Sequence, residues 1–364
     1  QKEFDLNLLT KFYKQKAEDL RNVISHTEKD SYITIELLFK LAIIPLTKQL
    51  TNIAGNLWYR SLQNARAERN EWLLLHEFES RDFICPDKEF SKKGFKAPED
   101  EEKEDADGED KPGKRKKATY EGGLVLDPKP GLYDKIVLLL DFNSLYPSII
   151  QEYNLCFTTV DRCTTHDFDG NQISDGKIDE VDVPDRGDNE DKAILPNILK
   201  MLVERRKQVK QFIKSEKDEG KLQQLEIRQK ALKLTANSMY GCLGFSSSRF
   251  YAKAIAALIT RKGRDALKAT VDITQNNLGY NVIYGDTDSV MIYTGMANLK
   301  ESLTIGEQIK KEVNKSYKWL EIEIDGVFRS LLLLKKKKYA ALLYSNLNDP
   351  NSYNKKEIKG LDMV

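Results

Sequence analysis

Hydrophobic residues follow two different periods along the chain, and together these predict a mixture of strands and helices. Residues 136–140 are an unbroken apolar run, which is typical of a strand covered on both faces. Residues 281–283 and 290–293 are β-rich runs joined by a short Gly/Asp segment. This arrangement predicts a hairpin with acidic residues at its tip.

Helical periods dominate much of the remaining sequence. Apolar residues recur at helical spacing over 194–213 and again over 222–240, with a polar turn near Gly220 between the two runs. We expect Gly241 to end the second helix, and two helices joined by so short a turn to lie antiparallel. The first eighty residues also have a helical pattern, in which Ser25 and Glu28 form a capping box and Pro45 breaks the run.

Acidic residues stand where two of the predicted strands end. Asp141 follows the apolar run directly, and Asp286 and Asp288 lie at the hairpin tip. Carboxylates placed side by side repel each other, and their burial is costly unless a cation compensates. The pattern therefore predicts bound divalent metal, such as Mg²⁺, with phosphates that share the metal.

The segment after Asp141 is expected to leave the sheet. Pro147 cannot donate to a strand ladder and disfavours a helical conformation at Tyr146. The backbone N–H groups of residues 143–146 should then be free for other partners, including phosphate oxygens.

The two predicted helices between the acidic strand ends carry groups that bind phosphate. Arg206 and Lys210 share one helix face, and Lys233, Asn237 and Tyr240 share another. Antiparallel helices could direct these cations toward one anion, with Tyr240 as an aromatic plate for a base. We interpret them as a triphosphate cradle that uses no P-loop, because no such motif occurs in the sequence.

Each of these patterns also has a purely structural interpretation. Aspartates in a turn often only form the turn, Arg206 and Lys210 could lie on a solvated helix face, and Tyr240 could belong to the core. The run Lys335–Lys338 suits either a solvated edge that blocks strand pairing or contact with a duplex backbone. Residues 321–325 alternate acidic and apolar, and we interpret Asp325 as part of an amphipathic strand rather than as support for the metals.

Several other functions lack support in the sequence. Residues 167–171 resemble a calcium loop, but no glycine stands at the sixth position and no glutamate falls at the twelfth. The 4 cysteines lack paired C-x-x-C spacing, so no zinc site is expected. With only 3 histidines and no G-x-S-x-G motif, a serine hydrolase is not expected either. No apolar run approaches the ~18 residues of a membrane helix.

The net charge of +1 hides a strong partition of charge along the chain. Residues 99–110 hold nine acidic residues and one lysine, and residues 167–191 hold ten acidic residues and two basic ones. We predict that both stretches are flexible insertions. The remainder of the chain is then strongly basic, as a protein that binds a phosphate backbone requires.

Five short segments resemble the motifs of one family, and they occur along the chain in the same order as in that family. Residues 141–149, 233–241 and 284–289 resemble motifs A, B and C of the family B DNA polymerases. Residues 335–339 resemble the Lys-Lys-Arg-Tyr element that follows motif C, and residues 120–123 the Tyr-x-Gly-Gly element that precedes motif A. Residues 51–56 and 240–245 are most similar to the eukaryotic α type of the family.

The resemblance implies a role for each matching residue. Asp141, Asp288 and the Phe142 carbonyl are expected to bind two Mg²⁺ ions, whereas Asp286 matches a third catalytic acid that is usually not a direct ligand. The ring of Tyr146 is expected to exclude a ribose 2′-hydroxyl. The implied nucleotide-binding residues are Ser144, Leu145, Tyr146, Arg206, Lys210, Lys233, Asn237 and Tyr240. The implied DNA-binding residues are Tyr120, Gly122, Gly123, Gly241, Thr287, Lys336, Lys337 and Tyr339.

The resemblance also implies an α+β fold shaped like a right hand. A palm of antiparallel sheet with helices is expected over 119–192 and 244–364, with an acidic insertion at 161–192, and helical-hairpin fingers over 193–243. Residues 1–80 match the end of an inactive exonuclease-like domain, 81–118 a flexible charged linker, and the thumb is expected to be missing. The chain begins with Gln1, so we expect a fragment.

The expected function is templated DNA synthesis by an α-type replicative polymerase that extends RNA primers. The expected partners are a primed DNA template with an RNA or DNA primer, deoxynucleoside triphosphates, primase and an accessory subunit, in the nucleus and without membrane association. Proofreading is not expected, because His26 stands where proofreading members carry tyrosine before Asp30. The alternative is a polymerase-like module that binds primer–template or replication partners without catalysis.

Overall fold

The computed structural model describes residues 17–86, 120–160, 181–184, 193–245 and 247–361. The chain divides into two compact units, one of Gln1–Leu73 with Val203–Thr235 and one of Leu74–Leu202 with Ala236–Val364. Most of the predicted linker and most of the predicted acidic insertion lie outside the described residues. None of the described helices combines the length and apolar character needed to cross a bilayer.

Helices form all of the described part of the first unit. Its N-terminal helices are α2 (Ala17–Lys40), α3 (Ile43–Ala54), α4 (Trp58–Leu62) and the start of α5 (Arg66–Glu79). The predicted break is confirmed: α2 ends at Lys40, Ala42 has a φ of 50°, and Pro45 lies in the first turn of α3, where no helical N–H is lost. The predicted capping box is wrong, because Ser25 lies inside α2 and the helical pattern already begins upstream of it.

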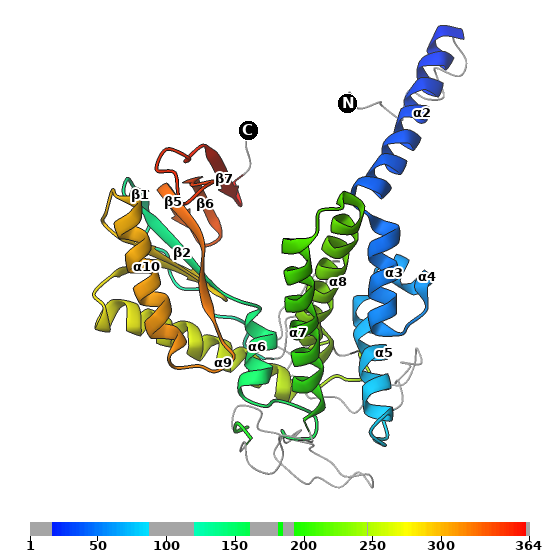
Figure 1. Cartoon of the computed structure of the whole chain (residues 1–364), viewed down its shortest axis with the longest axis horizontal. Coiled ribbons are helices and arrows are strands. Elements are labelled where there is room, and N and C mark those ends of the chain that lie inside the picture. Colours follow the sequence, from blue (N-terminus) through cyan, green and yellow to red (C-terminus); the bar gives the residue numbers. More distant parts are fainter. Residues whose placement is uncertain (1–16, 87–119, 161–180, 185–192, 246, 362–364) are drawn as a thin grey trace, which may run out of the picture. The chain divides into compact units, whose positions relative to one another are not determined.

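The two long helices predicted after residue 194 are present. They are α7 (Ile194–Ser215) and α8 (Glu219–Leu243), joined by a turn in which the Glu216 carboxylate accepts hydrogen bonds from two backbone N–H groups. The two helices lie side by side, as predicted (Figure 1), and Arg206 Nε donates a hydrogen bond to Gln229 Oε1 at 2.9 Å. Gly241 does not end α8, which continues to Leu243 because the apolar contacts of Cys242 and Leu243 extend the helix into the core.

An antiparallel sheet with helices packed on it forms the second unit. Its strands are β1 (Gly131–Tyr133), β2 (Val137–Phe142), β3 (Asn281–Asp286), β4 (Ser289–Tyr293), β5 (Ile322–Lys335), β6 (Lys338–Leu343) and β7 (Lys355–Lys359). Among the described residues their order is β3-β4-β2-β5-β6-β7, and β1 pairs with β5 (Figure 1).

The helices of this unit are α6 (Leu145–Glu152), α9 (Lys253–Asp272), which continues into a π-helical turn at Ile273–Asn277, and α10 (Leu299–Asn314). Helix α10 packs against β2 and β5, and α9 packs against α6 and β4. Gly306 allows α10 to approach β5 closely, because a Cβ at this position would lie 2.6 Å from Ile324 Cδ1.

Strand β2 is covered on both faces at Val137 and Leu138, but the predicted coverage does not extend to its end. Leu138 and Leu140 are fully buried, whereas Leu139 and Asp141 are only partly buried and line a cavity on the opposite face. Alternation along the strand therefore separates a helix-covered face from a cavity face. On the cavity face, a buried cluster around Val137, Phe328 and Leu331 forms a second small core beside the cavity.

The packing of β5 predicts opposite responses at two neighbouring leucines. Leu333 is 0% exposed and belongs to this cluster, whereas Leu334 is 45% exposed. We expect Leu333→Ala to reduce the free energy of unfolding by about 2–5 kcal/mol. The matched substitution Leu334→Ala should cost less than about 1 kcal/mol. Urea denaturation measures both, and equal losses would contradict the strand register.

Candidate active site

The predicted meeting of the two acidic strand ends is confirmed. Strand β2 pairs with β4 so that Asp141 lies opposite Ser289, and the Phe142 N–H donates to the Asp288 carbonyl at 2.9 Å. Asp141, Asp286 and Asp288 line one cavity of about 750 Å³. Residues about 145 positions apart in the sequence thus lie at one end of the sheet.

The hairpin tip between β3 and β4 has an unusual backbone. Thr287 has a φ of 60°, which is uncommon for a β-branched residue because its side chain crowds the backbone there. Its N–H donates to the Leu124 carbonyl at 2.8 Å, and its hydroxyl donates to Asp286 Oδ1 at 3.1 Å. These contacts hold the tip in a conformation that the sequence alone would disfavour.

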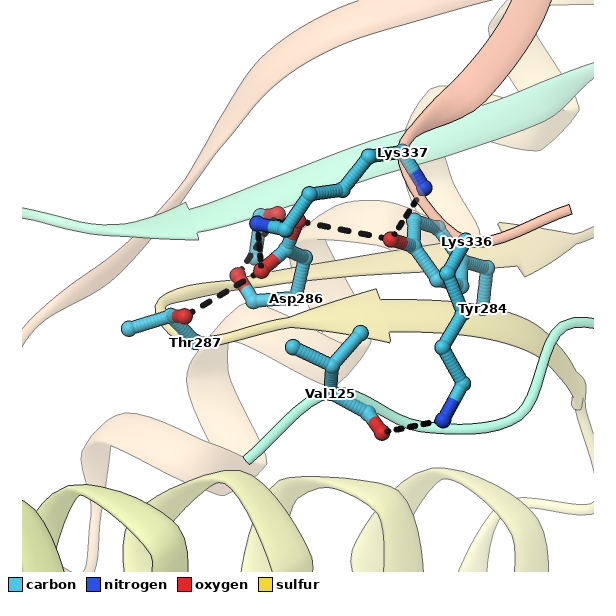
Figure 2. Close-up of polar contacts among 7 residues, drawn as sticks. Val125, Tyr284, Asp286, Thr287, Lys336 and Lys337 are labelled. Atoms are coloured by element: carbon cyan, nitrogen blue, oxygen red, sulfur yellow. Dashed lines mark hydrogen bonds and ion pairs between the residues drawn. The ribbon is translucent and has the colours of Figure 1, made fainter. Parts of the chain in front are cut away.

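Asp286 accepts hydrogen bonds from three different residues, as Figure 2 shows. The Lys337 ammonium lies 2.9 Å from Oδ1 and 2.7 Å from Oδ2, Thr287 bonds Oδ1, and the Tyr284 hydroxyl lies 3.3 Å from Oδ2. The carboxylate raises the pKa of Lys337, chiefly through this hydrogen bond. The positive charge of Lys337 therefore balances the negative charge of the Asp286 carboxylate.

Asp288 lies in a different electrostatic environment. Burial raises the pKa of its carboxyl, and the carboxylates of Asp286 and Asp325 act in the same direction, while Lys337 opposes them. An acid that is harder to ionise in the folded protein gains from a nearby divalent cation, which would favour its charged form.

Asp325 joins the cavity, contrary to its interpretation as only part of an amphipathic strand. It lies on β5, whose pairing with β2 places Glu323 opposite Asp141, and its side chain lines the same cavity as Asp141 and Asp288. The alternation of acidic and apolar residues predicted the strand but not the pairing register. That register decides which acids reach the cavity.

The segment after Asp141 differs from the prediction in two ways. Tyr146 and Pro147 both lie in the first turn of α6, where proline is tolerated because the N–H it lacks would have no helical acceptor. The Asn143 N–H is not free but donates to the Glu321 carbonyl at 2.8 Å. Ser144, with a φ of 49°, and Leu145 begin the helix, so their N–H groups belong to its N-terminal turn, which suits an anion.

Three tyrosines form a cluster beside this helix. The rings of Tyr146 and Tyr240 lie 4.4 Å apart between centroids, and the hydroxyls of Tyr240 and Tyr120 are 3.1 Å apart. Burial raises the pKa of Tyr146, and the Asp288 carboxylate contributes in the same direction. A Cβ at Gly244 would lie 2.5 Å from the Tyr120 hydroxyl, so this glycine gives the cluster its space. Tyr240 is therefore only partly a core residue.

Arg264 of α9 is a site residue that the sequence did not indicate. Its Nη1 donates to the carbonyls of Glu121 at 2.9 Å and Gly122 at 2.8 Å, and its Nη2 lies 3.3 Å from the Glu121 carboxylate. It thereby ties the Tyr-x-Gly-Gly segment to α9. No local pattern distinguishes this arginine from others on a helix.

The Tyr-x-Gly-Gly segment continues along β3. The Leu126 N–H donates to the Gly285 carbonyl at 2.9 Å, and a Cβ at Gly123 would lie 2.8 Å from Thr287 Cγ2. The ammonium of Lys336 reaches the same segment, where it lies 3.4 Å from the Val125 carbonyl (Figure 2). It also lies 2.8 Å from the Asp127 carboxylate. Three segments predicted separately thus lie together in space.

Tyr339 and β7 complete the cavity wall. Tyr339 is buried and donates to Glu357 Oε1 at 2.9 Å, so its hydroxyl is engaged within the protein. Lys355, Glu357 and Lys359 line the cavity from β7, although the sequence did not single them out. Gly241 is exposed on α8.

The predicted triphosphate-binding residues are divided between the two units. In the first unit, Arg206 and Lys233 line a cavity of about 440 Å³ together with Lys40 and Lys230, and Lys210 is exposed outside it. Burial lowers the pKa of Arg206, which is half-buried rather than on a solvated face. Asn237 and Tyr240 belong to the second unit.

The chemistry of the donor groups suits a hard cation. The acids that line the cavity offer carboxylate oxygens, which Mg²⁺ prefers. Within the described ranges, no three His, Cys, Asp or Glu residues form a ready-made metal-binding group. Mg²⁺ needs no such group, since it commonly binds one or two carboxylates and completes its coordination with water and substrate phosphates.

Comparison with known proteins identifies the family. The profile described as DNA polymerase family B matches residues 56–364. The chain belongs to this family.

Similar proteins of the family include DNA polymerase alpha catalytic subunits. That of Sterkiella nova is 61% identical over 376 residues, covering 100% of this chain and 25% of that protein. That of Mus musculus is 53% identical over 363 residues, covering 96% of this chain and 24% of that protein. The chain therefore spans about a quarter of the length of these relatives.

A solved structure supports the same assignment of the fold. The family B DNA polymerase from Pyrobaculum calidifontis superimposes with a TM-score of 0.62 at 28% sequence identity, covering 95% of this chain and 39% of that one. The mixed fold of helices and antiparallel sheet predicted from the sequence is thus confirmed for this family B chain.

Two adjacent glycines allow a test of the contact between the Tyr-x-Gly-Gly segment and the hairpin tip. A Cβ at Gly123 would meet the short, hydrogen-bonded Thr287 side chain, whereas a Cβ at Gly122 would meet nothing within 4 Å. We expect Gly123→Ala to lower the free energy of unfolding by about 1–3 kcal/mol, because Thr287 has no room to move. Gly122→Ala should change it by less than about 0.5 kcal/mol. If denaturant unfolding gave the same value for both, the close contact would be refuted.

Proposed function

We propose that the chain carries the catalytic centre of a DNA-templated DNA polymerase, which adds deoxyribonucleotides to a primer 3′-hydroxyl. The observation that carries this proposal is the pairing of β2 with β4, which brings Asp141 and Asp288 to one cavity in a family B chain. Their carboxylates are the groups that would hold two Mg²⁺ ions, with the Phe142 carbonyl as a further ligand.

The metal ions, when bound, lower the pKa of the primer hydroxyl and neutralise charge on the triphosphate and the leaving pyrophosphate. The protein orients the reactants around them. The Phe142 N–H donates a hydrogen bond to the Asp288 carbonyl, and this bond fixes the hairpin tip against β2. Asp286 is engaged by Lys337, which supports a role away from the metals.

The incoming nucleotide would contact groups from several elements. The N-terminal turn of α6, with Ser144 and Leu145, offers N–H groups to phosphate oxygens. Arg206, Lys210, Lys233 and Asn237 match nucleotide-binding positions of the family, and within the first unit Arg206 and Lys233 share a cationic cavity. The Tyr146 ring, packed on Tyr240, would exclude a ribose 2′-hydroxyl and so select deoxyribonucleotides.

The primed template would lie over the segments that surround the cavity. Residues 120–123, Thr287, Gly241 and the turn at Lys336–Lys337 are the proposed DNA contacts. In this arrangement the sheet would serve as the palm and the α7–α8 hairpin as the fingers.

The similarity to alpha catalytic subunits supports a role in extending RNA primers, in complex with primase and an accessory subunit in the nucleus. The same similarity supports the absence of proofreading. His26, which replaces a tyrosine of proofreading members, lies 3.1 Å from Asp30 within α2.

Substitution of the two cavity aspartates tests the function directly. We expect Asp141→Asn and Asp288→Asn each to slow primer extension by a factor on the order of 10³ or more, because each removes charge that would hold the metals. The assay is Mg²⁺-dependent extension of a primed template, which EDTA should stop and added Mg²⁺ should restore.

The control for this test is Asp272→Asn, at the exposed end of α9, which should extend primers at the normal rate. Loss of folding is a separate outcome, and thermal unfolding checks it. Asp288→Asn should not be less stable, because it removes a charge that burial disfavours. A wild-type protein that binds primed DNA yet never extends it would favour the non-catalytic module instead.

The proposed sugar gate makes a second prediction. Tyr146→Ala should increase incorporation of ribonucleotides relative to deoxyribonucleotides by at least about tenfold, since it removes the ring that would clash with a 2′-hydroxyl. Tyr146→Phe keeps the ring and should leave the selectivity near normal. Steady-state incorporation with single nucleotides measures both, and an unchanged ratio for Tyr146→Ala would place the gate elsewhere.

A further inference from the structure

The turn between β5 and β6 holds a lysine in a conformation that favours glycine. Lys337 has a φ of 60°, in the left-handed region where a side chain crowds the backbone. Two-residue hairpin turns usually place Asn, Asp or Gly at such positions. A long cationic residue is unfavourable for this turn. We therefore infer that lysine stands at position 337 for the contacts of its ammonium group and not for the conformation of the turn.

Three contacts hold this strained turn in place. The Lys337 N–H donates to the Tyr284 hydroxyl at 2.9 Å, and its ammonium bonds both oxygens of Asp286 (Figure 2). On the other side, a Cβ at Gly360 would clash with the Lys337 carbonyl oxygen, so the residue that follows β7 packs directly against the turn. Both ends of the Lys337 residue are therefore tied to the protein.

The Asp286 carboxylate is arranged to receive Lys337 and little else. Thr287 occupies one of its oxygens and Tyr284 lies beside the other, while the ammonium bridges both. The side chain of Asp286 is 20% exposed and that of Lys337 is 65% exposed, so the anchored ammonium still faces solvent at the cavity. A cation held in this way is available to an anionic ligand without first having to be ordered.

We propose that Asp286 is a positioning residue that acts through Lys337: it fixes the ammonium in the strained β5–β6 turn so that this cation meets the backbone of the bound DNA. The proposal rests on the proposed function in that the ligand is a primed duplex. It assigns Asp286 a task separate from metal binding.

The sign of one effect distinguishes this role from others. A carboxylate that merely lay near the DNA would repel phosphates, and its neutralisation would tighten binding. A carboxylate that anchors a DNA-contacting lysine has the opposite effect, because the freed ammonium must be ordered again on binding. Weaker binding after loss of a negative charge therefore identifies the anchor.

The experiment measures the affinity of the purified protein for a primed duplex by fluorescence anisotropy over a range of salt concentrations, without divalent metal. The variants are Asp286→Asn, Lys337→Gly and the double variant. Lys337→Gly suits the positive φ, so it removes the ammonium without destabilising the turn.

We expect each single variant to raise Kd by about fivefold to tenfold, and the double variant to be no weaker than Lys337→Gly alone, because the two residues act as a unit. Lys337→Gly should also reduce the slope of log affinity against log salt by about 1, the value for one lost phosphate contact. Tighter binding by Asp286→Asn, or single-variant effects that simply multiply in the double variant, would overturn the proposal.

A matched ion pair outside the cavity serves as the control. Glu312 of α10 and Lys315, which follows this helix, lie 2.6 Å apart, close to the 2.7 Å of Asp286 and Lys337. Glu312→Gln should leave Kd unchanged within about twofold, the usual scale for an exposed pair.

Two further readouts separate this proposal from the proposed function. Acylation of lysine amines, followed by mass spectrometry, should label Lys337 several-fold faster in Asp286→Asn than in the wild type. This measurement requires neither DNA nor catalysis.

In primer extension, Asp286→Asn should leave the half-saturating Mg²⁺ concentration within about twofold of normal, whereas loss of a metal ligand would raise that concentration by far more. Unchanged labelling of Lys337, or a large shift in the Mg²⁺ requirement, would overturn the anchor even if the protein is an active polymerase. Normal DNA binding and labelling without any extension by the wild type would instead refute the proposed function alone.

Discussion

The pairing of β2 with β4 is the constraint on which the rest of the site depends. It sets Asp141 opposite Ser289 and joins the Phe142 N–H to the Asp288 carbonyl, so two acids from distant segments must share one end of the sheet. Like charges brought together in a partly buried place destabilise the fold unless something compensates. Burial raises the pKa of Asp288, and the carboxylates of Asp286 and Asp325 act in the same direction. A nearby divalent cation would favour the charged form of this acid.

Lys337 supplies a positive charge at this acidic end of the sheet. It pairs with Asp286, and Asp141, Asp288 and Asp325 line the same cavity. Backbone strain accompanies this arrangement, with positive φ values at Ser144, Thr287 and Lys337 around the site. Such strain persists where surrounding contacts over-determine the conformation, and here they come from the segment 120–127, from Tyr284 and from β7. Sheet, hairpin and turns thus hold the polar groups in place before any ligand binds.

Much of the fold and the location of the site follow from local sequence patterns. Residue periodicity predicted the α7–α8 hairpin, the β3–β4 hairpin and β2, and the acidic ends of the strands indicated where the chemistry lies. The errors have specific causes. Pro147 was expected to disfavour a helical conformation at Tyr146, but both residues lie in the first turn of α6. Gly241 was expected to end α8, but the helix continues because Leu243 packs in the core. Both cases show tertiary context overriding a local signal.

The contacts that the sequence could not reveal depend on register and on tertiary pairing. Asp325 reaches the cavity only because β5 pairs with β2 in one register, and Arg264 acquires its partners only when α9 packs beside residues 121–122.

The most direct measurement is anomalous diffraction from crystals grown with Mn²⁺, primed DNA and an incoming nucleotide. We predict manganese between the carboxylates of Asp141 and Asp288, with Lys337 still paired to Asp286. Manganese bound by Asp286 with Lys337 displaced, or absent from both cavity aspartates, would contradict the shared-cation site.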